Sequence, residues 1–249
     1  MRRPVIVANW KMFKTRTETR AFFEAFKVLV ADSRHCDIVV APPFTDLATA
    51  AESVAGSAIA IGAQDAHWQR EGAFTGEVSM QMLVDVGCRY VIVGHSERRQ
   101  LFGETNESVS RKAKAALAAG LTPIVCVGET LAQREGNETH AVLKQQFDES
   151  LASLTPEEFS RILMAYEPCW AIGTGRTATP ELAAETQHLI RERAAARFSA
   201  ERASELRILY GGSVKPDNIR GLMAQVEIDG ALVGGASLDP HSFASIVNF

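Results

Sequence analysis

Eight short apolar runs recur along the chain of 249 residues, and each is followed by a longer segment with helical spacing. The runs are rich in β-branched residues and are continuous rather than alternating, as expected of strands buried on both faces of a parallel sheet. They span Val5–Ala8, Ile38–Ala41, Ile59–Gly62, Tyr90–Val93, Pro123–Val127, Ile162–Tyr166, Arg207–Tyr210 and Ala231–Val233. This repetition of strand and helix predicts an α/β fold.

The segments between these runs carry helix start and stop signals. Their expected bounds are Glu18–Val30, Thr45–Val54, Ser79–Val86, Glu107–Ala119, Glu138–Leu154, Pro180–Phe198, Pro216–Ala224 and Pro240–Val247. A proline at the first helical position opens the last three, and Gly120 closes the fourth.

Eight strand–helix pairs fit either a doubly wound open sheet or a closed (β/α)8 barrel. No GxGxxG follows the first strand, and no shift in composition marks a second domain. A length of 249 residues with 46% hydrophobic residues suits one barrel. We therefore expect a single barrel domain over residues 1–249.

Charge and cysteine content exclude several classes of protein. The 26 basic and 30 acidic residues give a net charge of −4, which argues against a nucleic-acid-binding surface. The four cysteines are far apart and form no CxxC pair, which argues against a metal site or disulfides and favours a cytoplasmic location. We expect neither a signal peptide nor membrane association, because no apolar run approaches the roughly 20 residues that span a bilayer.

Polar side chains follow three of the expected strands, and in a barrel such positions meet at one mouth. Asn9 and Lys11 follow the first strand, His95 the fourth and Glu167 the sixth. Glu167 is a candidate general base. The polar run after His95 would open a helical turn whose backbone N–H groups favour a neutral, donating imidazole. With Lys11 and Asn9 holding an oxyanion, this set suits removal of a proton next to a carbonyl without a metal.

Each of these residues also has a simpler interpretation. His95 fits a hydrogen-bonded structural histidine, and Glu167 a solvated carboxylate in a tight turn. Lys11 fits a solvated lysine or a structural salt bridge with Glu97. The Arg98-Arg99 step is expected to form structural or interface ion pairs.

Glycine-rich turns follow the last three expected strands. Glycines let backbone N–H groups approach an anion closely, which predicts a phosphate site. One such turn alone is equally typical of a plain tight turn. The turns contain Gly173, Gly211-Gly212-Ser213 and Gly234-Gly235.

Two loops stand out. The segment after Glu167 has a rigid proline start, an apolar middle and a glycine tip, and we expect it to act as a lid. The connection from Gln64 to Gly76 is long and aperiodic, and its aromatic residues suggest a surface for a partner. We expect its His67 to be at the surface. The lid residues are Pro168, Cys169, Trp170, Ala171, Ile172, Gly173, Thr174 and Gly175.

Six motifs, in order from residue 9 to residue 237, resemble the triosephosphate isomerase family. They are 9–12 (NWKM), 72–77 (GAFTGE), 94–99 (GHSERR), 166–175 (YEPCWAIGTG), 210–214 (YGGSV) and 234–237 (GGAS). The resemblance implies a TIM barrel that interconverts dihydroxyacetone phosphate and D-glyceraldehyde 3-phosphate through an enediolate. It implies a step of glycolysis and gluconeogenesis that needs no cofactor.

The resemblance also implies a role for each matching residue. Glu167 would be the base and His95 the electrophile, an assignment that is the family's own. Lys11 and Asn9 would bind substrate and stabilise developing charge, and Glu97 would support Lys11 and proton movement. The phosphate would be held by the backbone of four residues under the closing lid. These are Gly173, Ser213, Gly234 and Gly235.

Family members are usually homodimers whose long third loop enters the partner subunit. That loop corresponds to Gln64–Gly76, with Thr75 as the reaching residue and Asp65 beside the interface. Three residues depart from the family pattern. Phe13 replaces a polar residue, Asp65 an asparagine whose extra charge needs a partner, and Cys169 an aliphatic residue, creating a reactive thiol if it is exposed.

Two other functions remain as alternatives. One is a barrel enzyme that acts on another sugar phosphate, which would need a roomier lid. The other is a silent barrel that binds phosphosugars, which would be expected to have lost Lys11, His95 or Glu167, and all three are present.

Overall fold

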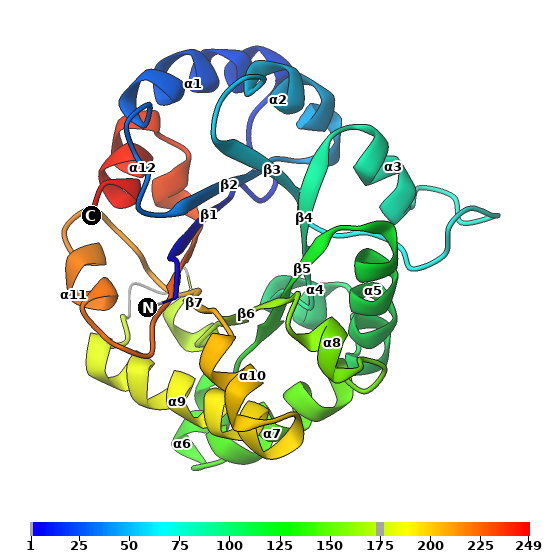
Figure 1. The fold of residues 1–249 in the computed structure, drawn as a ribbon, viewed down its shortest axis with the longest axis vertical. Helices are drawn as coiled ribbons and strands as arrows, with labels where there is room; N and C mark the ends of the chain where they lie inside the picture. The colour runs from blue at the N-terminus through cyan, green and yellow to red at the C-terminus, as the bar shows by residue number, and fades with distance from the viewer. Residues whose placement is uncertain (1, 173–176) are drawn as a thin grey trace.

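The structure, a computed structural model, describes residues 2–172 and 177–249. In this part of the chain eight parallel strands form a closed barrel in sequence order, and the last strand pairs with the first (Figure 1). The predicted barrel is therefore confirmed. The strands are β1 (Val5–Asn9), β2 (Asp37–Ala41), β3 (Ile59–Ala63), β4 (Cys88–Val93), β5 (Thr122–Val127), β6 (Leu163–Tyr166), β7 (Ile208–Tyr210) and β8 (Gly230–Val233).

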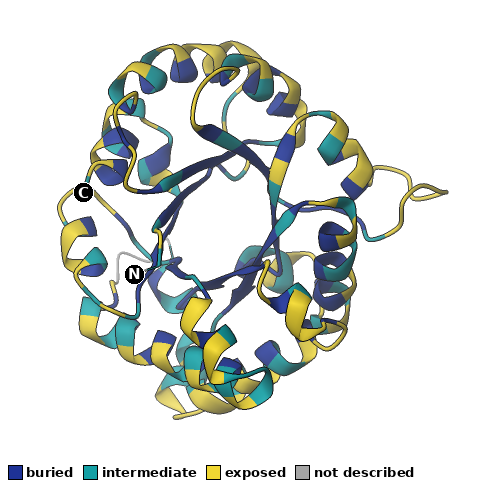
Figure 2. Cartoon of the chain, viewed as in Figure 1, coloured by how far each residue is buried: buried dark blue, intermediate teal, exposed yellow. Residues whose placement is uncertain are grey.

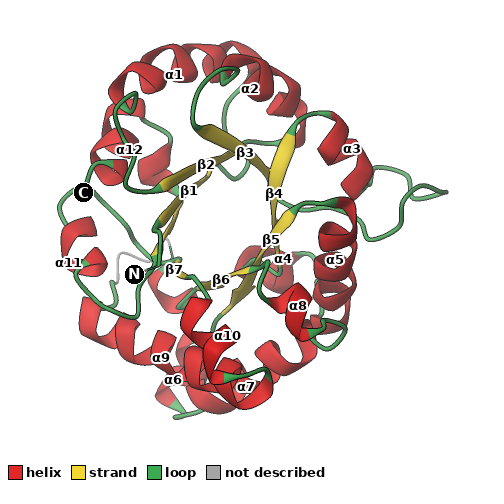
Figure 3. Cartoon of the chain, in the orientation of Figure 1, coloured by secondary structure: helices red, strands yellow, loops and turns green. Residues whose placement is uncertain are grey.

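Helices surround the barrel on its outside (Figure 3). Of the helices in the described part of the chain, none is long and apolar enough to cross a membrane. The α-helices are α1 (Arg16–Leu29), α2 (Leu47–Ser53), α3 (Met80–Asp85), α4 (Ser96–Leu101), α5 (Asn106–Ala119), α6 (Leu131–Glu135), α7 (Thr139–Ser150), α8 (Pro156–Phe159), α9 (Pro180–Arg197), α10 (Ala200–Glu205), α11 (Ile219–Met223) and α12 (Pro240–Val247). The short 3₁₀ helices are η1 (Phe44–Asp46), η2 (Cys169–Ala171) and η3 (Gly235–Ser237).

The expected helix bounds hold to within two residues, except at the start of α11 and the end of α7. Helix α7 ends at Ser150 and not at the expected Leu154, because residues 151–154 form turns in which Ala152 N–H donates to the carbonyl of Glu149 and Leu154 N–H to that of Leu151.

The helical turn expected after His95 is confirmed as α4. The helix start at Pro216 was wrong, because Asn218 caps a turn there by accepting from the backbone N–H of Lys215 and donating to the carbonyl of Ser213. Helix α11 begins after that turn. The short helices α6, α8 and α10 were not expected, since they are too brief to show a period.

The strands are buried on both faces, as their continuous apolar runs predicted (Figure 2). Val5 and Val7 point into the barrel and pack with Val39 and Ile124. Their neighbour Ile6 belongs to the second core, between the barrel and the helices. Two concentric apolar layers thus hold the strand ends in place, and the mouth of the barrel is where polar residues gather.

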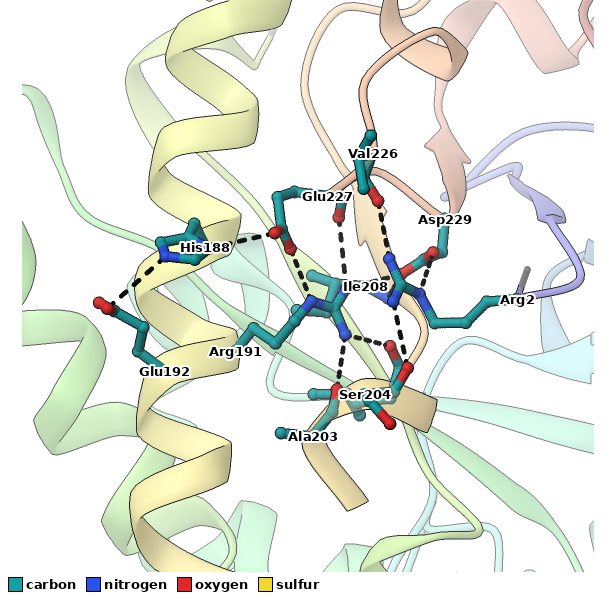
Figure 4. A network of polar contacts seen from close by, with 11 residues as sticks. Arg2, His188, Arg191, Glu192, Ala203, Ser204, Ile208, Val226, Glu227 and Asp229 are labelled. Carbon is teal, nitrogen blue, oxygen red and sulfur yellow. Dashed lines mark hydrogen bonds and ion pairs between the residues drawn. The ribbon is translucent and has the colours of Figure 1, made fainter. Parts of the chain in front are cut away.

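A polar network ties the start of the chain to its last strand at the opposite end of the barrel (Figure 4). Asp229, just before β8, pairs with the guanidinium groups of Arg2 and Arg191. It also accepts the backbone N–H of Ile208 at 2.9 Å. Arg191 donates further to Glu227 at 2.6 Å. Ordered charges of this kind fix the register between β1, β7 and β8.

The loop of residues 64–76 projects away from the barrel, and most of it is exposed (Figures 1 and 2). Thr75 lies in its exposed part. The expectation that His67 is exposed was wrong, because its ring packs against Trp68 and Phe74 with centroids 4.2 and 4.3 Å away. Asp65, at the base of the loop, is buried.

Candidate active site

One cavity of about 280 Å³ lies at the carboxyl ends of the strands. It brings together residues from the ends of β1, β4, β6, β7 and β8, as a barrel with chemistry at that face requires. Of the predicted catalytic and binding residues, Asn9, Lys11, His95, Glu167, Ser213, Gly234 and Gly235 line it. Glu97 is reached through Lys11.

Lys11 is held in an unusual backbone conformation at the mouth. Its φ is 53°, in the left-handed region that non-glycine residues rarely adopt and that is frequent at functional sites. Asn9 Oδ1 accepts its N–H at 3.1 Å, and Gln64 Nε2 donates to its carbonyl at 2.8 Å. Its Nζ lies 2.6 Å from Glu97 Oε1. The salt bridge considered from the sequence therefore exists, and it holds Lys11 in the wall of the cavity.

His95 is the N-cap residue of α4 and is buried. Its Nδ1 accepts the backbone N–H of Glu97 at 3.2 Å, so the proton of the neutral ring is on Nε2. Nε2 lies 3.1 Å from Glu167 Oε1. This arrangement presents an N–H donor to the cavity, as expected for an imidazole that polarises a carbonyl.

Glu167 is 1% exposed, at the point where β6 ends. Its Oε2 accepts the backbone N–H of Ser96 at 2.8 Å. Gly211 lies directly behind it, because a Cβ on Gly211 would be 2.7 Å from Glu167 Cγ. The carboxylate is thus held on one side by the N-terminus of α4. On the other side it leaves no room for a residue larger than glycine at position 211.

The glycine-rich turns at the ends of β7 and β8 form part of the cavity wall. Among the residues that the structure describes, none accepts a hydrogen bond from the backbone N–H of Ser213 or of Gly235. Lys215 also lines the cavity. Unpaired backbone donors beside a lysine favour an anion such as phosphate.

Part of the predicted lid is described. Pro168 is followed by η2, and Ala171 and Ile172 line the cavity. Trp170 Nε1 donates to Glu129 Oε1 at 3.0 Å, and the hydroxyl of Tyr166 donates to the same oxygen at 3.1 Å. The base of the lid is therefore bonded to a buried carboxylate. The predicted lid residues Gly173, Thr174 and Gly175, and with them the predicted phosphate contact of Gly173, lie outside the described residues.

Cys169 is partly buried in η2, and its thiol lies 3.5 Å from the carbonyl oxygen of Glu167, to which it donates. Burial, with the nearby charges of Glu167 and Glu129, raises the pKa of the Cys169 thiol to about 12. The exposure on which a reactive thiol was predicted to depend is therefore not met, and at neutral pH this group stays protonated.

Sequence reasoning missed four contributors to the site. Gln64 directly follows β3 and Glu129 comes two residues after β5, which is close to the signal that pointed to Glu167, but neither was singled out. Ser96 acts through its backbone, and Lys215 follows a turn whose shape the sequence does not show. Within residues 2–172 and 177–249, no group of three or more His, Cys, Asp or Glu is arranged to hold a metal ion.

Comparisons with known proteins all match this chain to a single family. The family model for triosephosphate isomerase matches residues 4–249. The chain is 61% identical to the triosephosphate isomerase of Solibacter usitatus over the full length of both proteins. It is 57% identical to that of Pelobacter propionicus, covering 100% of this chain and 99% of the relative. The enzyme of Symbiobacterium thermophilum is 52% identical, over 99% of this chain and 96% of its own.

Proposed function

The chain belongs to the triosephosphate isomerase family and interconverts dihydroxyacetone phosphate and D-glyceraldehyde 3-phosphate, a step of glycolysis and gluconeogenesis; we propose that Glu167, His95, Lys11 and Asn9 carry out this reaction. The observation that supports the proposal most directly is the 3.1 Å separation of Glu167 Oε1 and His95 Nε2 beside one cavity. A base and a proton donor are thereby close enough to act on adjacent atoms of one small substrate.

The proposed reaction moves one proton between neighbouring carbons. The Glu167 carboxylate removes a proton from the carbon next to the carbonyl, while the Nε2–H of His95 donates to the carbonyl oxygen. The electron pair of the C–H bond forms the double bond of an enediolate. The hydroxyl proton is passed from the second oxygen to the former carbonyl oxygen through His95 Nε2. Return of the abstracted proton to the other carbon then gives the isomer and restores the carboxylate.

Lys11 and Asn9 stabilise the charge that develops on oxygen. The ammonium of Lys11 is already oriented by Glu97 at 2.6 Å, so little side-chain entropy is lost when substrate binds. Glu97 also contacts His95 through its backbone N–H, and we assign it the support of both residues. A charge held in place before the reaction stabilises the transition state most effectively.

We assign phosphate binding to the backbone of Ser213, Gly234 and Gly235, with Gly173 completing the site from the lid. The lid of residues 168–175 closes over the substrate. Its apolar residues Ala171 and Ile172 then exclude water, which protects the enediolate from loss of phosphate.

We further propose that residues 1–249 form one domain, that the enzyme is a cytoplasmic homodimer, and that Thr75 reaches the partner subunit. Exposed apolar side chains next to Lys11 support the homodimer. Met12 is 92% exposed and Phe13 is 56% exposed in the single chain. Burying such groups against a second copy is favourable. We assign Asp65, at the base of the loop, to the same dimer interface.

The experiment is isomerisation of D-glyceraldehyde 3-phosphate by the wild type, by Glu167→Gln and by the control Glu24→Gln on the exposed side of α1. We expect the Glu167 variant to lose more than the roughly 10²–10⁴-fold of general base catalysis alone. The control should match the wild type. A Glu167→Gln enzyme within tenfold of the wild type would refute the assignment of the base.

A further inference from the structure

One glutamine of the outer helical layer holds the backbone of a residue at the mouth of the barrel. Gln146, in α7, bonds with both ends of its side-chain amide to Gly128, the residue directly after β5. The Gly128 N–H donates to Gln146 Oε1 at 2.8 Å, and Gln146 Nε2 donates to the Gly128 carbonyl at 3.0 Å. An amide that accepts from and donates to the same residue fixes both the position and the orientation of that backbone.

Gly128 and its two neighbours contact the backbone that carries the candidate base. The carbonyl of Val127 accepts the N–H of Glu167 at 2.8 Å. The carbonyl of Glu129 accepts the N–H of Cys169 at 3.1 Å. Between these bonds Gly128 touches Glu167 directly, because a Cβ on Gly128 would lie 1.7 Å from the carbonyl oxygen of Glu167. The position of Gly128 therefore sets the position of the Glu167 backbone.

Helix α7 is a firm support for this contact. Phe147, the residue after Gln146, is buried and packs edge-on against Phe159 of α8 with ring centroids 6.2 Å apart. The carbonyl of Asp148 accepts from Arg197 of α9 at 2.6 Å. Helix α7 is thus anchored in the outer layer independently of the barrel mouth, and Gln146 transmits this fixed position to Gly128.

Glu167 is not packed by protein atoms all round. A second cavity of about 160 Å³ adjoins the substrate cavity, and Gln146 and Gly128 line it. Among the residues that the structure describes, Glu167 alone lines both cavities. Because side-chain packing around Glu167 is incomplete, backbone contacts such as that with Gly128 decide where the carboxylate lies.

We propose that Gln146 is a positioning residue of the isomerase, which holds Gly128 and through it the backbone of Glu167, so that the carboxylate reaches the substrate carbon. The inference rests on the proposed role of Glu167 as the base. Gln146 lines the second cavity and not the substrate cavity, so it acts through Gly128 and not on the substrate.

The test is steady-state kinetics of Gln146→Met, which keeps the length and helix propensity of the side chain and removes both bonds to Gly128. The matched control is Gln145→Met, a change at the neighbouring exposed glutamine, which bonds to Glu149 on the same helix. We expect kcat of the Gln146 variant to fall by about 10- to 100-fold, the range for a misplacement of up to an ångström. KM should change less than about threefold, because the predicted phosphate site is built on the ends of β7 and β8. The control should match the wild type.

A kinetic isotope effect separates a displaced base from a destabilised fold. The substrate carries deuterium on the carbon that Glu167 deprotonates and is compared with the unlabelled substrate. Lid motion or product release limits kcat in many enzymes and masks this isotope effect. A displaced base slows proton transfer, so the isotope effect on kcat should be larger in Gln146→Met than in the wild type. A smaller folded fraction would lower kcat and leave the isotope effect unchanged.

A second variant, Gln146→Glu, keeps the acceptor for the Gly128 N–H. It loses the donor to the Gly128 carbonyl at about pH 8, where the introduced carboxyl group is ionised. This variant should also lose kcat and show a larger isotope effect. It retains a polar group at a half-buried position, so it carries the test alone should Gln146→Met not fold.

The inference is overturned if either folded variant keeps its kcat within about twofold of the wild type. It is also overturned if kcat falls and the isotope effect is no larger than that of the wild type. Failure of the proposed function has a different signature, since Glu167→Gln would then remain active in the same assay.

Discussion

Replacing Gly211 by alanine tests how tightly the base is held. The φ of Gly211 is one that alanine can adopt, so the effect comes from space and not from backbone strain. The added Cβ would lie 2.7 Å from Glu167 Cγ and 3.3 Å from the carbonyl oxygen of Tyr166. Carbon atoms in ordinary contact are about 3.5–4.0 Å apart, so the overlap is about 1 Å.

The backbone at this point cannot move away to relieve the overlap. The N–H of Gly211 donates to the carbonyl of Tyr166 at 2.8 Å, inside the barrel wall. Glu167 must therefore shift by about 1 Å. A misplacement of this size costs on the order of 10²-fold in rate. Since each tenfold corresponds to 1.36 kcal/mol, the transition state loses about 2.7 kcal/mol.

The assay is the initial rate of isomerisation over a range of substrate concentrations. We expect kcat of Gly211→Ala to fall about 100-fold. The control is Gly221→Ala in α11, where the nearest atom to the new Cβ is Pro180 Cγ at 3.6 Å. That control should keep its kcat and gain about 0.5–1 kcal/mol of stability, because alanine favours a helix over glycine. A Gly211 variant with kcat within twofold of the wild type would show that Glu167 is not confined as described.

Three further predictions follow from buried groups. Glu129→Leu leaves the buried hydroxyl of Tyr166 without its acceptor, and should lower the free energy of unfolding by about 1–3 kcal/mol in a denaturant titration. Cys169 should react with iodoacetamide about a thousandfold more slowly than an exposed cysteine at pH 8. Because the pKa of its thiol is raised, the labelling rate measured by mass spectrometry should keep increasing with pH toward 12. Rapid labelling at pH 7 would contradict this. Asp229→Ala leaves two partly buried guanidinium groups without the buried carboxylate that they share and should cost about 3–5 kcal/mol, whereas an unchanged melting temperature would show that the network contributes nothing.

The strands were predictable from the sequence because burial on both faces leaves a continuous apolar run. The run that ends at Tyr166 is an example, since its end located the candidate base Glu167 as the next residue. The same signal was available for Glu129, which follows β5, but its role depends on Trp170, more than 40 residues away in the chain. Partners so distant in sequence cannot be assigned without the fold.

Other parts of the site were hidden for different reasons. Ser96 contributes a backbone N–H, and any residue type could supply it. The positive φ of Lys11 is imposed by Asn9 and Gln64 and has no sequence signature. A proline such as Pro216 often begins a helix. Here Asn218 instead caps a turn by accepting the backbone N–H of Lys215, so the helix begins later. Local rules failed where a side chain from elsewhere, or a competing cap, decided the conformation.

The pairing of β1 with β8 sets the order in which a newly made chain can become an enzyme. Arg2 and Asp229 are 227 positions apart, and at about 5–20 residues per second the ribosome needs roughly 10–50 s to produce the second after the first. During that time β1 has β2 on one side and an unpaired apolar edge on the other, which is a template for contact with other nascent chains. Asn9 and Lys11 meet Gly234 and Gly235 only when this edge is covered. Protection from aggregation and the first turnover therefore arrive together, with the last strand.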